Sequence, residues 1–156
     1  MLLAVALAMA LNLAAHSVGN GADSPHAKPS TELSRGITTM KIRLTINGKA
    51  ISATLTTNGT ANDFLSLLPM TLTLDDYAAT EKIAYLPRKL STAGAPAGSD
   101  PSVGDIAYYA PWGNLAIFYR DSGYARGLIP LGRIDSGIEA LSVSGPLKVT
   151  IEPVEK

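Results

Sequence analysis

The chain has 156 residues, of which 46% are hydrophobic and 17% are charged, a composition typical of one globular domain with a hydrophobic core. Thirteen basic residues balance thirteen acidic ones, so the sequence indicates no basic surface for a nucleic acid or an anionic membrane. There is no cysteine, and both histidines, His16 and His26, precede Lys28. Disulfides, thiolate nucleophiles, histidine-based triads and Cys/His zinc sites are therefore excluded from Lys28 onward.

The first predicted element is an apolar run, Leu2 to Ala15, that is shorter than the about 20 residues of a membrane-spanning helix. Its length matches the hydrophobic region of a secretory signal peptide, and small residues that a signal peptidase could recognise follow it. No Lys or Arg precedes the run, which departs from the usual pattern, and an N-terminal core helix is the alternative. We predict a signal peptide over residues 1–19, a periplasmic or secreted protein, and no stable membrane insertion of the mature chain.

The next segment has a different composition. Asn20 to Gly36 is rich in Gly, Ser, Pro, Asp and Lys and has almost no large apolar residue. Such a composition is typical of a flexible linker. We therefore predict a linker over residues 20–39 and a folded domain over residues 40–153.

The folded domain begins with a predicted β-hairpin over Met40 to Leu55. Apolar and polar residues alternate on both sides of Asn47-Gly48. Such alternation around an Asn-Gly pair is a strong hairpin signal, because a type I′ turn needs positive φ at both of its central residues.

A helix is predicted after the second Asn-Gly pair, with Thr60 as its N-cap and Pro69 closing it. Asp63 would reach back to the cap or complement the helix dipole. Four apolar residues fall at helical spacing on one face: Ala61, Phe64, Leu65 and Leu68. Core packing is the favoured interpretation of Phe64, which is also kept as a candidate ligand contact.

Short β-rich segments separated by turn residues fill the rest of the chain. A short helical turn is expected at Ile138 to Leu141, and a Gly/Ala/Pro/Ser loop at Ser91 to Ser102. The predicted strands are Met70–Leu74, Ile83–Leu86, Val103–Tyr109, Leu115–Tyr119, Leu128–Ile134 and Leu147–Ile151. With the two hairpin strands they make eight, a pattern that predicts a mainly β, closed or nearly closed barrel with one or two short helices.

Several of these segments together resemble the small bacterial cyclophilin-like proteins. The resemblance covers residues 40–151, and it is carried by the helix ANDFLSLLP, the strands MTLTL and LIPLGRI, and the segments EKIAYLPRKL and GDIAYYAPWGNLAIFYRD. It implies a cyclophilin-like β-barrel of about eight strands that is closed at its ends by helical segments. The biochemical function of that family is generally unassigned.

The chain departs from true cyclophilins, which are prolyl isomerases, at the residues of their activity. Their Phe-His-Arg strand, which carries the catalytic arginine, has no counterpart, since no histidine follows His26. Their Phe-Phe-Ile run has only a loose echo in Ala116-Ile117-Phe118. The resemblance therefore implies the fold and does not imply the isomerase activity.

The aromatic residues around the predicted turn at 110–114 are the candidate walls of a ligand pocket. Alternation along a strand places Tyr108 and Tyr109 on opposite faces, so only one of them can line a given cavity, and Phe118 and Tyr119 divide in the same way. Trp112 lies in the turn itself, where the demands of the core are weaker. We predict Trp112 and Tyr109 as ligand contacts.

Arg88 and Arg120 are the candidate polar groups for such a ligand. An arginine beside an apolar groove could polarise a prolyl amide by hydrogen bonding, without a nucleophile or a metal, and Arg126 and Arg133 are further candidates for that role. Arg120 follows the aromatic strand at the predicted barrel rim, and Arg88 follows Pro87 in a loop. A solvated or salt-bridged surface arginine is the alternative for each, and it is the more common one.

The acidic residues Asp75, Asp76 and Glu81 offer a weaker signal. They could bind calcium or act as an acid/base pair, but neighbouring side chains at a strand end diverge, so a solvated turn is favoured. The sequence has no Gly-rich phosphate loop, no GxSxG elbow and no HExxH motif. We therefore predict no metal site, no cofactor and no catalytic residue.

These expectations lead to one functional prediction and one alternative. The first is an exported, non-catalytic binding module on a cyclophilin-like barrel, with a peptide or a small molecule as its ligand. The alternative is a weak peptidyl-prolyl cis-trans isomerase or a periplasmic folding helper. A purely structural interaction domain is a third interpretation.

Overall fold

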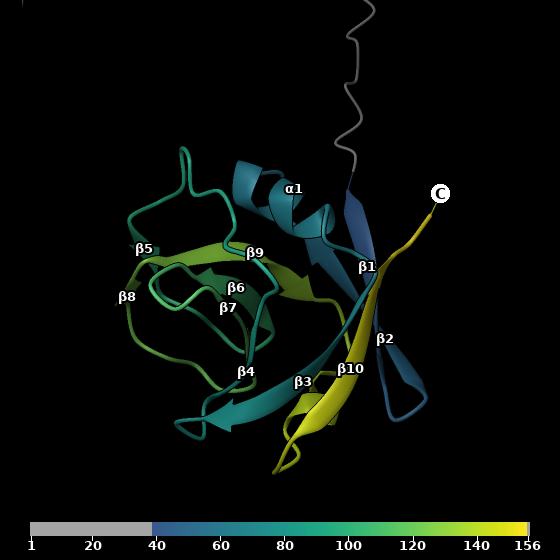
Figure 1. Ribbon diagram of the computed structural model, residues 1–156. Coiled ribbons are helices and arrows are strands. Elements are labelled where there is room, and N and C mark those ends of the chain that lie inside the picture. Colours follow the sequence, from purple (N-terminus) through teal and green to yellow (C-terminus); the bar gives the residue numbers. More distant parts are fainter. Residues whose placement is uncertain (1–38, 156) are drawn as a thin grey trace, which may run out of the picture. The chain divides into compact units, whose positions relative to one another are not determined.

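The computed structural model describes residues 39–155 of the chain, which belong to the compact unit Gly36–Lys156. The predicted signal peptide and residues 20–38 of the predicted linker lie outside the described residues. The described part is mainly β-structure with one short α-helix and one 3-10 turn, as the sequence predicts (Figure 1).

Eight strands form a closed barrel in which every neighbouring pair is antiparallel. The predicted fold class is therefore confirmed. In barrel order the strands are β1 (Met40–Ile46), β10 (Leu147–Pro153), β3 (Met70–Tyr77), β4 (Glu81–Tyr85), β7 (Asn114–Phe118), β6 (Asp105–Tyr109), β9 (Leu128–Ile134) and β2 (Lys49–Leu55).

The β1–β2 hairpin forms as its alternation predicts. Asn47 and Gly48 have φ values of 49° and 78°, the left-handed conformation that a type I′ turn requires. The pairing of Ile46 with Lys49 closes the turn directly, and the register places Leu44 opposite Ile51 on the inner face. The polar residues between them face outward, so this hairpin specifies both its turn and its orientation in the barrel.

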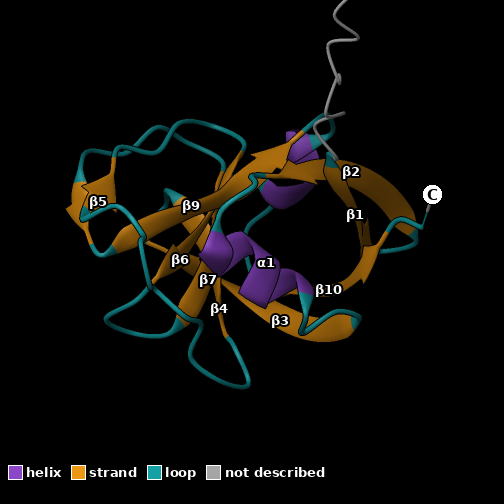
Figure 2. Ribbon diagram, turned by 90° about the horizontal axis from the view of Figure 1, so that it is seen from above, coloured by secondary structure: helices purple, strands orange, loops and turns teal. Residues whose placement is uncertain are grey.

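A single hydrophobic core fills the barrel, and the helix α1 (Gly59–Leu65) covers one of its ends (Figure 2). Phe64, on this helix, has no solvent-exposed surface. Large, fully buried apolar side chains of this core come from seven elements of the fold: Ile42, Leu44, Phe64, Leu74, Ile106, Tyr108, Leu115, Ile117, Leu131 and Leu141. The 3-10 turn η1 (Ile138–Leu141) contributes the last of these, at the position where a short helical turn is expected.

The N-cap of α1 differs from the predicted one. Asn58 caps the helix, since its side-chain oxygen accepts a hydrogen bond from the Ala61 N–H at 2.7 Å. Thr60 is buried and instead donates its hydroxyl hydrogen bond to the Ser91 carbonyl at 2.8 Å. Both residues are good caps, and the tertiary contact with the 91–102 loop decides between them.

A second, smaller apolar cluster lies outside the barrel wall, on the outer face of β6, β7 and β9. Its buried members are Ala107, Ala116, Phe118 and Leu128. The two-stranded sheet of β5 (Gly98–Ser99) and β8 (Ala125–Arg126) lies on this side of the barrel, away from β1 and β10 (Figure 1). The strands β6 and β7 are therefore apolar on both faces.

The acidic turn is more ordered than the sequence predicts, because β3 continues through Asp76 to Tyr77. Asp76 lies opposite Lys82 in the β3–β4 pair, and Lys82 is completely buried. The Lys82 ammonium donates hydrogen bonds to the Val143 and Gly145 carbonyls, at 2.7 Å each, and forms an ion pair with Asp76 at 2.8 Å. All three donors of this lysine are satisfied, and its contact lowers the pKa of Asp76 below its ordinary value.

Candidate functional site

A cavity of about 220 Å³ lies on the outer face of the barrel, beside the second apolar cluster. Four aromatic side chains contribute to its walls: Tyr77, Tyr109, Trp112 and Phe118. Its polar residues are Glu81, Asn114, Thr80 and Ser122, and the remaining ones are small or apolar. None of the lining residues, all of which belong to the described part of the chain, is a lysine, arginine or histidine.

The strand register explains how these residues meet. Glu81 on β4 lies between Tyr77 on β3 and Phe118 on β7, because it is the pairing partner of both. Residues directly opposite one another point to the same face, so the carboxylate is flanked by two aromatic side chains. Four residues away along β7, Asn114 pairs with Tyr109 on β6. The cavity therefore has one polar residue at each end of the same stretch of sheet.

Two small residues lie on the same face of the sheet, between these two ends. Ala107 and Ala116 are paired with each other on β6 and β7, and both are buried in the outer cluster. Each lies two positions from a larger cavity residue on its own strand, Tyr109 and Phe118 respectively, and so shares its face. Neither alanine lines the cavity itself.

Trp112 reaches the cavity from the turn between β6 and β7. The turn is closed by the N–H groups of Trp112 and Gly113, which both donate to the Tyr109 carbonyl, at 3.3 and 2.9 Å. Gly113 has a φ of 74°, a conformation that favours glycine. The Trp112 ring stands edge-on to Tyr77 and to Tyr109, with 5.3 Å between ring centroids and interplanar angles of 88° and 80°. The three rings thus form a connected aromatic wall, and Trp112 itself is 45% exposed.

Two hydrogen-bond acceptors of the cavity have no protein donor. Asn114 is 1% exposed, and its amide nitrogen donates to the Leu115 carbonyl at 3.2 Å, while its Oδ1 has no hydrogen-bond partner among residues 39–155. Glu81 is half-buried, and burial raises the pKa of its carboxyl above the ordinary value. Its side chain makes no hydrogen bond or ion pair within the described part of the chain. Glu81 is free to accept a hydrogen bond from a ligand, whereas the Asn114 Oδ1 is an unpaired acceptor that the protein encloses.

A family model described as "Cyclophilin-like family" matches residues 44–152. The chain belongs to this family. Its barrel is also similar to the solution structure of a hypothetical protein from Archaeoglobus fulgidus, with a TM-score of 0.54 and 18% sequence identity over 74% of this chain and 95% of that one. No curated protein matches the chain. The resemblance read from the sequence is thus confirmed, and the comparisons support a cyclophilin-like barrel whose function is unassigned.

The cyclophilin-like barrel brings together two of the five residues predicted as ligand contacts. Trp112 and Tyr109 line the same cavity and are in direct ring contact. Tyr108 points to the opposite face, where it is 1% exposed and accepts a hydrogen bond from the Leu90 N–H at 3.1 Å. Phe64 lies in the inner core with no exposed surface and does not line the cavity.

Arg120 is exposed and does not line the cavity, but its backbone helps to hold the rim. The N–H groups of Tyr119 and Arg120 both donate to the Thr80 carbonyl, each at 3.1 Å. These bonds tie the end of β7 to the β3–β4 turn. In that turn Ala78 and Ala79 have φ values of 50° and 51°, a left-handed conformation that is uncommon for alanine.

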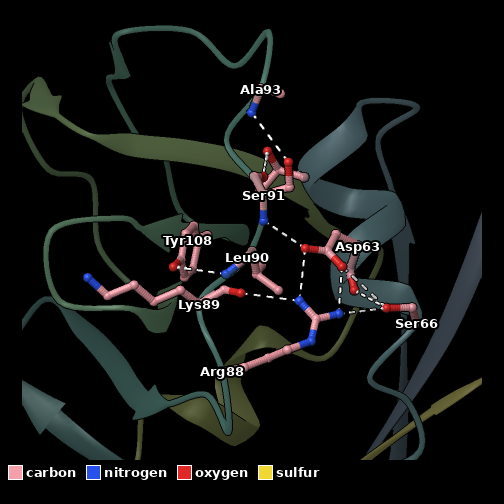
Figure 3. Close-up of polar contacts among 9 residues, drawn as sticks. Asp63, Ser66, Arg88, Lys89, Leu90, Ser91, Ala93 and Tyr108 are labelled. Carbon is pink, nitrogen blue, oxygen red and sulfur yellow. Dashed lines mark hydrogen bonds and ion pairs between the residues drawn. The ribbon is translucent and has the colours of Figure 1, made fainter.

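Arg88 lies away from the cavity and is engaged with α1 (Figure 3). Its guanidinium donates to both carboxylate oxygens of Asp63, at 2.6 and 3.0 Å, and to the Ser66 hydroxyl at 3.0 Å. Asp63 also accepts the Ser91 N–H at 2.7 Å, and these contacts lower its pKa to about 2. Arg88 therefore joins the loop after β4 to the helix, which is the salt-bridged alternative weighed for it.

The cavity residues that sequence reasoning missed as ligand contacts include Tyr77, Glu81 and Asn114. Phe118 is a candidate pocket wall in the sequence, and it lines the cavity in the structure. Alternation along β4 indicates that Glu81 shares a face with Ile83 and Tyr85. It does not reveal that β7 and β3 place Phe118 and Tyr77 on either side of it. Those strands are far apart in sequence, so only the barrel register exposes the site.

Residues 39–155 lack two further features. In that range no helix combines the length and the apolar character that crossing a membrane demands. Nor does any group of three or more His, Asp or Glu side chains in that range come close enough together to hold a metal ion.

Proposed function

We propose that this protein is an exported, non-catalytic binding module whose cavity beside Trp112 holds a small molecule or one side chain of a peptide. The observation that carries the proposal is the combination of an aromatic wall with the half-buried Glu81 carboxylate, which has no ion-pair or hydrogen-bond partner among residues 39–155. Apolar walls with a few placed polar groups are typical of ligand sites, since the walls supply affinity and the polar groups orient the ligand.

The size of the cavity limits the ligand. An apolar cavity of about 150 Å³ accommodates benzene, whereas sites for drug-sized ligands span about 300–1,000 Å³. At about 220 Å³ this cavity suits one ring with a short chain, or one long side chain. A whole nucleotide or flavin would extend well beyond it.

The surrounding structure supports a site that is formed before the ligand arrives. Phe118 and Leu128 are buried members of the outer cluster, and Asn114 is fixed in the middle of the β4–β7–β6 sheet. Backbone hydrogen bonds also hold the rim, including that from the Ser122 N–H to the Pro101 carbonyl at 3.1 Å. A rigid site loses little conformational entropy on binding, which favours affinity.

The experiment is a titration followed by the fluorescence of Trp112, the only tryptophan of the chain. We expect saturable changes with members of a library of small molecules and short peptides. Calorimetry with the best ligand should then show that Trp112→Ala weakens binding at least about tenfold, while Val143→Ala, an exposed apolar residue outside the cavity, has no effect. A flat response across the whole library would overturn the proposal.

The isomerase alternative predicts a different result. Polarising a prolyl amide requires a donor at the bound peptide, and the arginines considered for that role do not line this cavity. An assay of prolyl isomerisation should therefore show no acceleration by the pure barrel. Acceleration that Arg120→Ala abolishes would establish the alternative instead.

Export is a separate part of the proposal and rests on the apolar run at the start of the chain. Mass spectrometry of the protein recovered from the periplasm or medium should show a mature N-terminus close to residue 20. A full-length protein confined to the cytoplasm would contradict export and leave the binding proposal standing.

A further inference from the structure

The side chains that line the cavity carry negative charge and no positive charge. Glu81 is the only ionisable side chain in the lining besides the tyrosines, and no basic residue of the described chain lines the cavity. The cavity thus offers hydrogen-bond acceptors and negative charge, and no positive charge to receive an anion.

Glu81 differs from the ion-paired aspartates of the described chain. Four aspartates each have a lysine or arginine partner, at 2.6 to 2.9 Å: Asp63, Asp76, Asp105 and Asp135. Glu81 has no such partner within residues 39–155, although it is half-buried between two aromatic residues. Burying a carboxylate without a cation is unfavourable. A cationic ligand that pairs with Glu81 would therefore offset this cost.

The aromatic wall favours the same kind of ligand. Tyr77 is the cross-strand neighbour of Glu81, and it contacts Trp112, which in turn contacts Tyr109. The rings of Tyr77 and Tyr109 each stand nearly perpendicular to the Trp112 ring, so together they border the cavity on more than one side. The faces of such rings attract organic cations, whose alkyl groups also pack well against them.

From these observations we infer that the cavity binds an organic ammonium group, with Glu81 as the counter-ion and Tyr77 and Trp112 as its aromatic neighbours. The inference rests on the proposed function and names the chemical class of its ligand.

Two sources supply this chemistry, namely a free alkylamine and the lysine side chain of a peptide. The experiment compares probes of one shape and different charge: butylammonium, 1-butanol and butyrate. A second set compares N-acetyl-lysine-N-methylamide with N-acetyl-norleucine-N-methylamide. We expect each ammonium probe to bind about 10- to 100-fold more tightly than its neutral counterpart, the range of a charge-assisted hydrogen bond, and butyrate to be the weakest. The tighter of the two ammonium probes identifies the source.

The variant Glu81→Gln keeps the shape of the side chain and removes its charge. It should remove the preference for ammonium while leaving the affinity for 1-butanol unchanged. Asp75→Asn is the matched control, because Asp75 is an exposed carboxylate on the neighbouring strand that does not line the cavity. For the wild-type protein, ammonium binding should also weaken as the pH falls through the pKa of Glu81, which burial places above the ordinary value for a glutamate.

The outcomes separate the two proposals. Equal affinities for ammonium and alcohol, or a preference for ammonium that survives in Glu81→Gln, would overturn the ammonium site. Binding of neutral ligands at Trp112 would at the same time uphold the proposed function. If no probe and no library member changes the fluorescence of Trp112, the proposed function itself fails.

Discussion

The two faces of strands β6 and β7 differ in whether their buried polar groups have hydrogen-bond partners. The inner faces of β6 and β7 contribute Tyr108, Leu115 and Ile117 to a core in which Tyr108, the polar member of the three, has a hydrogen-bond partner. Their outer faces contribute Tyr109 and Asn114 to a cavity in which an amide oxygen has none.

The contrast is sharpest between two consecutive residues of β4. Lys82 is completely buried, and its ammonium has three acceptors, whereas its neighbour Glu81 faces the cavity and has no partner among residues 39–155. Both carry a charge that burial disfavours, and only that of Lys82 is compensated within the described part of the chain. The comparison teaches that polar groups on the inner face are satisfied by the fold itself, while the outer face leaves a half-buried carboxylate unpaired.

The largest test of this comparison uses the only two phenylalanines of the chain, one in each region. Phe64→Ala should cost about 3–5 kcal/mol of the free energy of unfolding, since it opens a void in the inner core. Phe118→Ala should cost about half as much, because its side chain already borders a cavity. Urea unfolding of both variants measures the difference, and equal losses would contradict the distinction between the faces.

Lys82→Met should have the next largest effect, about 3 kcal/mol. The substitution removes the donors of two carbonyls and the partner of Asp76 while keeping a side chain of similar length. Thermal or urea unfolding provides the measurement, and Lys148→Met, at an exposed position on β10, is the control. A neutral result would show that the buried ammonium adds nothing to the inner face.

Asp63→Asn should destabilise the protein by about 2 kcal/mol at neutral pH, because its charged hydrogen bonds join α1 to the loop after β4. The pKa of Asp63 is about 2, against an ordinary 3.8, so this stabilisation is present above about pH 4. It is lost as the pH falls towards 2. The difference between wild type and variant should therefore shrink over that range in unfolding experiments, and Asp100→Asn, an exposed carboxylate, should show no such change.

The smallest effect is expected for Glu81→Gln, with a gain in stability of at most about 0.5 kcal/mol. Burial raises the pKa of Glu81, so the folded state holds this proton more tightly than the unfolded state does. The charged form is then slightly unfavourable above that pKa, and the penalty disappears as the pH falls through it. Denaturant titrations at neutral and acidic pH measure this, and a loss of stability at neutral pH would mean that the carboxylate has a structural partner.

Local patterns in the sequence predicted those parts of the fold that local forces decide. The alternation around Asn47-Gly48, the short helix and the 3-10 turn at Ile138–Leu141 all form in their expected places. Strand alternation also predicted correctly that Tyr108 and Tyr109 lie on opposite faces of β6. The prediction of Thr60 as the N-cap of α1 was wrong, since Asn58 caps the helix. The hydroxyl of Thr60 binds the Ser91 carbonyl instead, a contact between residues distant in sequence that local patterns do not reveal.

By itself, the sequence determined the mainly β architecture, its membership of the cyclophilin-like family, and the presence of Trp112 and Tyr109 beside one turn. Only the tertiary structure decided that Arg88 is engaged by Asp63 and that Glu81 stands between Tyr77 and Phe118. The physical reason is range. Alternation and turn chemistry act between neighbours in the chain, whereas the partners of a charge are set by which strands the closed barrel places side by side.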